Sequence, residues 1–194
     1  MKKIIEDKLA ESSRVIAATA AQSETVARMA EALILAFSRG HKLLAFGNGG
    51  SACDATNFAD ELTGRYERNR PGLPALSLNT NTSDLTSIAN DFGYEFVFER
   101  PLRALAKKGD VVVAISTSGN SPNVLKAAQA ARELGLTVLG FTGESGGKLK
   151  ALCDLCLCAP SKSTARGQEA HIAVIQIICG LVEESMFPDA PKAH

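Results

Sequence analysis

A glycine-rich turn, GNGGS at residues 47–51, is followed by a segment in which Asn57 and Glu61 are four residues apart. Residues at this spacing lie on one face of an α-helix, so the amide and the carboxylate are expected side by side. The turn follows the apolar run KLLAF, an arrangement that favours an anion held by backbone amides at a helix start. A carboxylate beside a held molecule can serve as its general acid or base. The turn alone is a weak signal, because the same glycines suit a tight strand-to-helix connection.

A second polar loop, STSGNS at residues 116–121, follows the apolar run VVVAI and precedes Pro122, a residue favoured in the first turn of a helix. Its hydroxyls, its glycine and the helix N-terminal amides form a phosphate cradle that needs no basic side chain. The alternative is an ordinary N-cap with surplus serines. Neither loop ends in the Gly-Lys-Ser/Thr of the P-loop, and Ala52 occupies the third glycine position of the dinucleotide fingerprint. We therefore expect a small phosphorylated metabolite as ligand and no nucleotide cofactor.

The composition excludes several classes of partner. The 194 residues carry 21 basic and 21 acidic side chains, so no charge excess directs the chain to nucleic acid or to an anionic membrane. No segment reaches the roughly 20 apolar residues of a membrane span, and no signal peptide is recognised, so a cytoplasmic location is expected. Five cysteines, an odd number, argue against a disulfide framework. The run Cys153-x-x-Cys156-x-Cys158 has metal-ligand spacing, but its place in an expected buried strand favours core residues.

Short apolar runs alternate with helix-like segments, which predicts a parallel sheet covered by helices on both faces. Residues 3–38 are predicted to form two helices, with Ser23 as a cap and Gly40 as a stop. The whole chain, 1–194, is then one doubly wound, three-layer α/β domain with a five-stranded sheet, and residues 1–40 are expected to take part in packing between subunits. Ligands of such sheets bind beyond the carboxyl ends of the strands, where both polar loops fall. The predicted strands are 42–46, 73–78, 110–115, 136–141 and 155–159, and the clearest predicted helices are 121–134 and 164–186.

Four segments together, in this order, resemble the phosphoheptose isomerases, single-domain members of the SIS (sugar isomerase) group. They are GNGGSACDA, RPGLPALSLNTNTSDLTSIANDFGYE, STSGNSPNV and ARGQEAHIAVIQIICGLVE. The resemblance covers nearly the whole chain. It implies a flavodoxin-like SIS fold, a cytoplasmic homotetramer, and conversion of sedoheptulose 7-phosphate to D-glycero-D-manno-heptose 7-phosphate for bacterial surface glycans such as lipopolysaccharide.

The resemblance also implies roles for individual residues. Glu61 and Gln176 stand at the catalytic acid/base positions. Glu61 and Gln168 stand at metal-ligand positions, and the other two ligand positions, where the family commonly has zinc-binding histidines, hold Asn57 and Gln176. The implied substrate-binding positions are Asn48, Gly49, Gly50, Ser51, Glu61, Arg65, Asn90, Asp91, Ser116, Thr117, Ser118, Ser121 and Gln168.

The two missing histidines change the expected chemistry. Zinc prefers nitrogen and sulfur donors over amide oxygens, so zinc binding is expected to be weak or absent. An amide does not exchange protons at neutral pH, so Gln176 could only hold an oxygen. Glu61 is then the expected base of a cis-enediol mechanism, while a water, His171 or the substrate's hydroxyls complete the proton transfer.

Two other classes of function remain open at this point. One is a phosphosugar-binding protein without turnover. The other is an interaction protein like the bacterial relative that binds the replication initiator DnaA. The amides at positions 57 and 176 favour these readings, whereas the presence of Glu61, Gln168 and Asp91 favours the enzyme.

Overall fold

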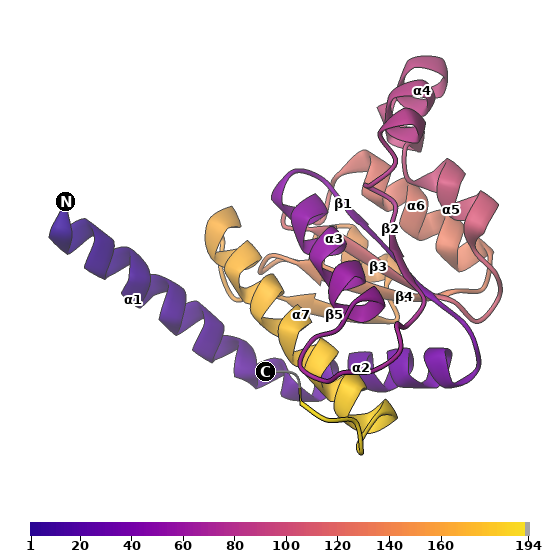
Figure 1. The fold of residues 1–194 in the computed structure, drawn as a ribbon. Helices are drawn as coiled ribbons and strands as arrows, with labels where there is room; N and C mark the ends of the chain where they lie inside the picture. The colour runs from indigo at the N-terminus through magenta and orange to yellow at the C-terminus, as the bar shows by residue number, and fades with distance from the viewer. Residues whose placement is uncertain (193–194) are drawn as a thin grey trace.

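In the computed structural model, which describes residues 1–192, the chain forms a three-layer α/β domain (Figure 1). Five strands form one parallel sheet in the order β2-β1-β3-β4-β5, the order of flavodoxin-like doubly wound sheets. The predicted fold class is therefore confirmed. The strands are β1 (Leu43–Gly47), β2 (Ala75–Ser77), β3 (Val111–Ser116), β4 (Thr137–Thr142) and β5 (Leu155–Cys158).

The helices differ in length and in the face of the sheet that they cover. The long ones are α1 (Lys2–Ala18), α2 (Ser23–Ser38), α3 (Gly50–Thr63), α4 (Thr82–Phe92), α6 (Pro122–Glu133) and α7 (Thr164–Met186). Shorter pieces are α5 (Glu99–Leu105) and the 3₁₀ turns η1 (Thr19–Gln22), η2 (Tyr94–Phe96) and η3 (Leu149–Leu152). Helices α2, α3 and α7 share a hydrophobic cluster with one face of the sheet, and α5 and α6 share a second cluster with the other.

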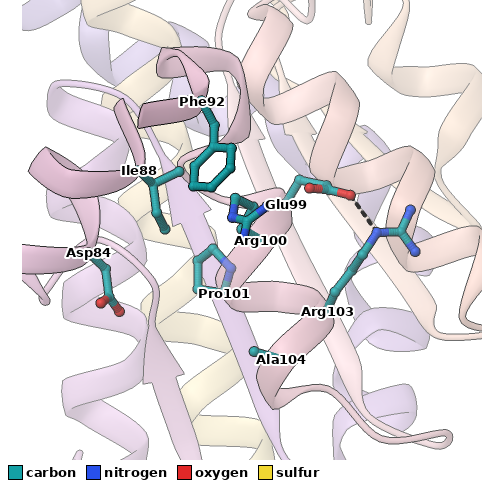
Figure 2. A pocket seen from close by; sticks show the side chains of 8 residues that line it. All are labelled: Asp84, Ile88, Phe92, Glu99, Arg100, Pro101, Arg103 and Ala104. Carbon is teal, nitrogen blue, oxygen red and sulfur yellow. Dashed lines mark hydrogen bonds and ion pairs between the residues drawn. The ribbon is translucent and has the colours of Figure 1, made fainter. Parts of the chain in front are cut away.

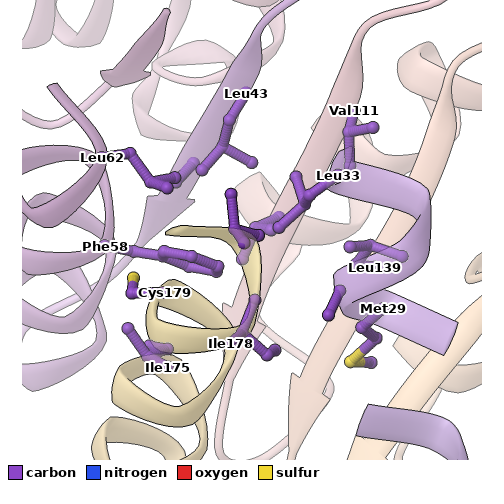
Figure 3. Packing of buried hydrophobic residues seen from close by; sticks show 14 of the residues in the cluster. Met29, Leu33, Leu43, Phe58, Leu62, Val111, Leu139, Ile175, Ile178 and Cys179 are labelled. Atoms are coloured by element: carbon purple, nitrogen blue, oxygen red, sulfur yellow. The ribbon is translucent and has the colours of Figure 1, made fainter. Parts of the chain in front are cut away.

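Alternate residues of the central strands supply the two clusters. In β1, Leu43 and Ala45 face α2, α3 and α7, while Leu44 and Phe46 face α5 and α6. Every residue of β1 and β3 is buried, as expected for strands covered on both faces. Figure 3 shows the first cluster, where Phe58 of α3 lies against α7 beneath the strands. Burial of one such side chain stabilises the fold by about 1.5–3 kcal/mol.

The strands and helices whose bounds the sequence predicted all lie within two residues of the predicted ranges. The largest difference is in β2, which is only Ala75–Ser77. The predicted cap at Ser23 is wrong: Gln22 holds the N-cap position, and no side chain caps the helix. The side chain of Gln22 instead accepts from the backbone N–H of Cys158 at 3.0 Å and donates to its carbonyl at 2.6 Å. These two bonds satisfy backbone groups of β5 at the edge of the sheet, where no neighbouring strand within residues 1–192 pairs with them.

Helix α1 extends away from the sheet (Figure 1) and has no buried residue. It is anchored by Arg166 of α7, whose guanidinium donates to the carbonyl of Lys8 at 2.7 Å. The apolar side chains Ile4, Ile5 and Leu9 are each more than half exposed. Within residues 1–192, no helix combines the length and the apolar character needed to cross a membrane.

A buried ion pair joins the end of α3 to α7. Arg70 Nε donates to Glu183 Oε1 at 2.8 Å, and both side chains are almost fully buried. Glu183 also accepts the backbone N–H groups of residues 66, 67 and 68, at 2.8–2.9 Å. Arg70 in turn donates to the carbonyls of Glu61 and Leu62, which are left open at the helix end. Burial alone would raise the pKa of Glu183, but these backbone bonds and Arg70 outweigh it and lower that pKa.

We expect Arg70→Ala to reduce the free energy of unfolding by about 3–5 kcal/mol, because Glu183 would remain buried without its partner. Urea denaturation followed by circular dichroism measures this. The matched control is Arg103→Ala, which removes an ion pair with Glu99 and Glu133 at the surface and should cost less than about 1 kcal/mol. Equal losses in the two variants would contradict the structural role assigned to Arg70.

Candidate functional site

The two polar loops leave the sheet side by side. β1 and β3 are neighbours in the sheet, and Gly47 pairs with Ile115 at their carboxyl ends. From β1 the chain continues into α3 on one face, and from β3 into α6 on the other. The strand order reverses at this point, and a crevice for ligands forms at such a switch in doubly wound sheets. The fold therefore brings together the two loops that the sequence singled out.

The loop after β3 gathers three hydroxyls. Ser116 Oγ lies 3.3 Å from Ser118 Oγ and 3.0 Å from Ser121 Oγ. Ser116 is buried at the strand end, while Ser118 is exposed and Thr117 is half-buried. Ser121 holds the N-cap position of α6, followed by Pro122, but its side chain makes no cap bond. The hydroxyls and the amides of the helix start are thus available to an anion. We call residues 116–121 the hydroxyl loop.

The glycine turn after β1 is braced by Asn79. Its side chain accepts from the N–H of Gly47 at 3.2 Å and donates to the carbonyl of Gly47 at 2.8 Å. Gly49 has φ 58°, in the left-handed region that favours glycine. Gly50 begins α3, and a Cβ there would collide with the side chain of Gln168. The turn is therefore held by Asn79 and lies against Gln168, near the start of α7.

An amide pair connects the two loops. Asn48 Nδ2 donates to Asn123 Oδ1 at 2.8 Å, and Asn123 Nδ2 donates to Asn48 Oδ1 at 2.9 Å. The hydroxyl of Tyr94 also donates to Asn48 Oδ1, at 3.1 Å. Sequence reasoning missed Asn123 and Tyr94. The signal for Asn123 was its spacing, since it precedes Ala127 by four residues and so belongs to the buried stripe of α6, where a polar residue needs a partner.

Two amides hold Glu61. Gln176 Nε2 donates to Glu61 Oε1 and to Asn57 Oδ1, both at 3.0 Å, and Asn57 Nδ2 lies 3.4 Å from the same Glu61 oxygen. All three side chains are half-buried. The bonds converge on Oε1, so Oε2 is the Glu61 oxygen that remains for chemistry. We call Asn57, Glu61 and Gln176 the amide–carboxylate cluster.

The cluster does not fit a zinc ion. Its only anionic donor is Glu61, and both hydrogens of the Gln176 amide are used within the cluster. Gln168, the fourth position in question, packs against Gly50 near the other end of α3. Within residues 1–192, no group of three or more His, Cys, Asp or Glu side chains is placed to hold a metal ion.

His171 is not part of this site. Its ring is fully buried, Nε2 bonds the carbonyl of Thr142 at 2.9 Å, and the ring edge meets Phe141. Burial lowers the pKa of His171, which favours the neutral ring. Five residues separate it from Gln176, about 140° around α7, so the two side chains leave the helix in different directions. His171 serves the core and does not carry a proton for Glu61.

Three other predicted site residues lie apart from the cluster. Asn90 and Asp91 are exposed at the end of α4 and bond each other at 2.8 Å. Arg65 is exposed just beyond α3. Figure 1 shows α4 projecting from the body of the domain. The side-chain bond of Asn90 and Asp91 is thus to each other, and Tyr94, just beyond α4, connects this region to Asn48.

An open hollow lies elsewhere, between α4 and α5 (Figure 2). It encloses about 630 Å³ and is widely open to solvent. Arg100 stacks over the ring of Phe92 on one side, 3.7 Å from the ring centre. None of the candidate site residues lines it. Convergent polar groups at the switch point are stronger evidence of a ligand site than the size of an open surface hollow.

A second carboxylate lies on the same helix as Glu61. Asp54 precedes Glu61 by seven residues, nearly two turns, and is therefore within about 20° of the same face. It is 8% exposed, and its Oδ2 has no hydrogen-bond partner among residues 1–192. Burial raises the pKa of Asp54 to about 6. Sequence reasoning missed this residue.

Comparison with known proteins gives consistent matches. The SIS domain family matches residues 9–143. A phosphoheptose isomerase of Trichlorobacter lovleyi is 54% identical over 162 residues, which cover 84% of this chain and 83% of that protein. One of Burkholderia pseudomallei is 48% identical over 186 residues, 94% of each. The solved phosphoheptose isomerase of Neisseria gonorrhoeae superposes with a TM-score of 0.89 at 41% identity, covering 94% of this chain and 98% of that one.

Asp54→Asn should stabilise the protein at pH 7 by about 1–3 kcal/mol, because the buried charge is removed. The folded pKa lies above the ordinary value of 3.8, so the wild-type protein is expected to lose stability as pH rises from about 4 to 6. Asp54→Asn should not show this loss of stability, so the difference in free energy of unfolding between the variant and the wild type should vanish near pH 4. Urea titrations across this range measure the effect. Asp60→Asn, exposed on the same helix, is the control, and equal profiles for the two variants would refute the interpretation.

The wild-type protein should retain no zinc after dialysis, whereas Asn57→His with Gln176→His should bind about one zinc per chain. The double variant restores two imidazoles beside Glu61, and zinc strongly prefers them to amides. Elemental analysis and titration against a chromophoric chelator give the stoichiometry. Tight, stoichiometric zinc binding by the wild-type protein would show that the amides of Asn57 and Gln176 can replace imidazoles as zinc ligands, and would contradict this prediction.

Proposed function

The chain belongs to the phosphoheptose isomerase family of SIS-domain proteins, and from this premise we propose that it converts sedoheptulose 7-phosphate to D-glycero-D-manno-heptose 7-phosphate. The observation that carries the proposal is the orientation of Glu61. Two amides fix one of its oxygens, which leaves the other as a positioned base on the helix that starts at the glycine turn. A binding protein without turnover would have no need for such a carboxylate.

The hydroxyl loop is the proposed phosphate site. Ser116, Ser118 and Ser121 present converging hydroxyls, and the start of α6 adds amides and the positive end of its dipole. A sugar phosphate bound there places its carbon chain along the neighbouring glycine turn. Asn48, Ser51 and Gln168 border that turn and supply hydrogen bonds to the sugar hydroxyls. The anion is thus recognised by neutral donors, which matches the absence of a net positive charge on the chain.

The reaction needs a proton moved between C1 and C2, at the far end of the sugar from the C7 phosphate. Glu61 removes the proton from C1, a cis-enediol forms, and protonated Glu61 returns the proton to C2. One carboxylate therefore serves as base and then as acid. Gln176 is a positioning residue, because both of its amide hydrogens hold Asn57 and Glu61.

Proton exchange between the two substrate oxygens requires a second path. No histidine stands at positions 57 and 176, and His171 is buried in the core. The proposal therefore assigns this exchange to water or to the substrate's own hydroxyls. A missing acid/base group typically costs about 10²–10⁴ in rate, so we expect slower turnover than in relatives with imidazoles.

The active form is proposed to be a cytoplasmic homotetramer with α1 and α2 at its centre. Support comes from exposed apolar side chains on α1 and from an apolar groove lined by α1, η1, α2 and α7. The groove includes Ile16, Val26, Ile177 and Leu181, and Ile177 is 54% exposed. Isolated chains would leave this surface in water, which favours association.

Glu61→Gln should lower the turnover rate by about 10²–10⁴-fold and change the affinity for sugar phosphate by no more than a few fold. The glutamine amide has the shape of the glutamate side chain but cannot act as a base. The assay is a proton NMR time course with sedoheptulose 7-phosphate in heavy water. Deuterium entering C1 or C2 reports the enediol even when net conversion is slow. Unchanged exchange in the variant would refute the role of Glu61.

The same time course tests the wild-type protein against the non-catalytic functions. Exchange or formation of an aldose phosphate establishes an isomerase. Substrate signals that shift without any exchange over a day would instead identify a phosphosugar-binding protein. Ser118→Ala, in the exposed part of the hydroxyl loop, is a matched variant that should weaken binding and leave the exchange rate of bound substrate nearly unchanged.

A further inference from the structure

Three cysteines meet at the edge of the sheet, away from the site described above. Cys156 and Cys158 lie on the same side of β5, with sulfur atoms 3.9 Å apart. Cys153 precedes the strand and packs against the cluster beneath α6. The hydroxyl of Thr142, on the neighbouring strand, donates to Cys158 Sγ at 3.4 Å and lies 3.6 Å from Cys156 Sγ. All three cysteines are half-buried, so small molecules can reach them.

Gly140 of β4 makes room for the thiols of Cys153 and Cys156. It pairs with Cys156 across the sheet, and a Cβ at this position would collide with Cys153 Sγ and press on Cys156 Sγ. Both sulfur atoms therefore occupy the space above one glycine. The chain bends at Asp154, which brings Cys153 back over the strand. Cys156 and Cys158, by contrast, are two residues apart in an extended strand, about 6.6–6.8 Å between Cα atoms, the upper limit for a disulfide.

The two thiols are not equivalent. Interaction with the neighbouring Cys153 thiol is the largest cause that lowers the pKa of Cys156, to about 6, with Thr142 and Cys158 adding to it. The same interaction, together with burial, raises the pKa of Cys153. A low-pKa thiol beside a protonated one is the arrangement of a reactive cysteine with a resolving partner.

We propose that Cys153 and Cys156 form an oxidisable dithiol, a modification site for hydrogen peroxide. The Cys156 thiolate attacks one peroxide oxygen and breaks the O–O bond, which gives a sulfenic acid and, after one proton is taken up, water. Cys153 then loses its proton and attacks Cys156 Sγ, which expels a second water and forms the disulfide. In total, two thiols are oxidised by two electrons and one peroxide is reduced to two waters.

A short chain of contacts joins this pair to the hydroxyl loop. Cys153 Sγ donates to the carbonyl of Leu149 at 3.2 Å, and the N–H of Leu149 donates to the carbonyl of Gly119 at 2.9 Å. The N–H of Lys148 also donates to Asn120 Oδ1, at 3.2 Å. A disulfide removes the Cys153 proton and with it the first of these bonds. Oxidation is therefore expected to loosen the support of the hydroxyl loop, a consequence that rests on the proposed function.

The test exposes the native full-length protein to a small excess of hydrogen peroxide, followed by alkylation and trypsin. Cleavage after Lys150 and Lys162 places all three cysteines on one peptide, residues 151–162. We expect this peptide to lose two hydrogens, reversibly with dithiothreitol. Cys158→Ser should retain the loss, Cys156→Ser should abolish it, and Cys153→Ser should leave a sulfenic acid on Cys156 that dimedone traps. Cys53→Ser, at an exposed thiol elsewhere, is the control.

The rate of oxidation should be about tenfold lower at pH 5 than at pH 7, because the thiolate fraction of Cys156 falls below its pKa. A bridge between Cys156 and Cys158, or over-oxidation of Cys156 without any bridge, would overturn the proposal, as would faster oxidation of Cys53 than of this pair.

In the isomerase assay, the protein with the Cys153–Cys156 disulfide should show a KM raised about two- to fivefold, and dithiothreitol should reverse this rise. An unchanged KM would refute the coupling to the loop. If no isomerase activity exists at all, the proposed function fails while the mass measurement still decides the dithiol.

Discussion

The buried ion pair between Arg70 and Glu183 sets the relation between the two helices that build the site. Arg70 closes the open carbonyls at the end of α3, and Glu183 of α7 collects the backbone amides of the segment that follows. Glu61 is one of the residues whose carbonyl Arg70 holds, and Gln176 lies two turns before Glu183 on α7. The interaction therefore fixes the separation at which the Gln176 amide meets the Glu61 carboxylate. Such a pair contributes little net stability but costs much if broken, which suits a constraint on geometry.

The amide–carboxylate cluster shows how a site keeps its shape when its chemistry changes. Asn57 and Gln176 stand where the family commonly has imidazoles, yet they do not leave a void. They bond each other and Oε1 of Glu61, so the two amides and the carboxylate hold one another in place. The result is a carboxylate held by neutral donors, and within residues 1–192 no group of three or more His, Cys, Asp or Glu side chains is placed to hold a metal ion.

The two strand-end loops are coupled to one another and to distant parts of the chain. Asn48 and Asn123 share a reciprocal amide pair, so a shift of the glycine turn is felt at the start of α6. On its other side, the hydroxyl loop rests on residues 146–149, where Gly119 packs so closely that a side chain would collide with Gly146. This contact leads to η3 and to Cys153, which precedes β5. The hydroxyl loop is therefore supported on both of its sides.

The sequence by itself determined the elements and both loops, because apolar runs, glycines and the Ser121-Pro122 helix start are local signals. It also located Asn57 and Glu61 on one helix face, since helical spacing needs no tertiary information. Tertiary structure alone decided which polar groups meet. The pairing of Asn48 with Asn123, 75 residues apart, and of Glu183 with Arg70 joins side chains whose local context is an ordinary helix or loop. The burial of Asp54 and His171 likewise follows from the packing of α3 and α7, which periodicity does not reveal. Contacts between distant segments depend on the register of whole elements, and no short stretch of residues encodes that register.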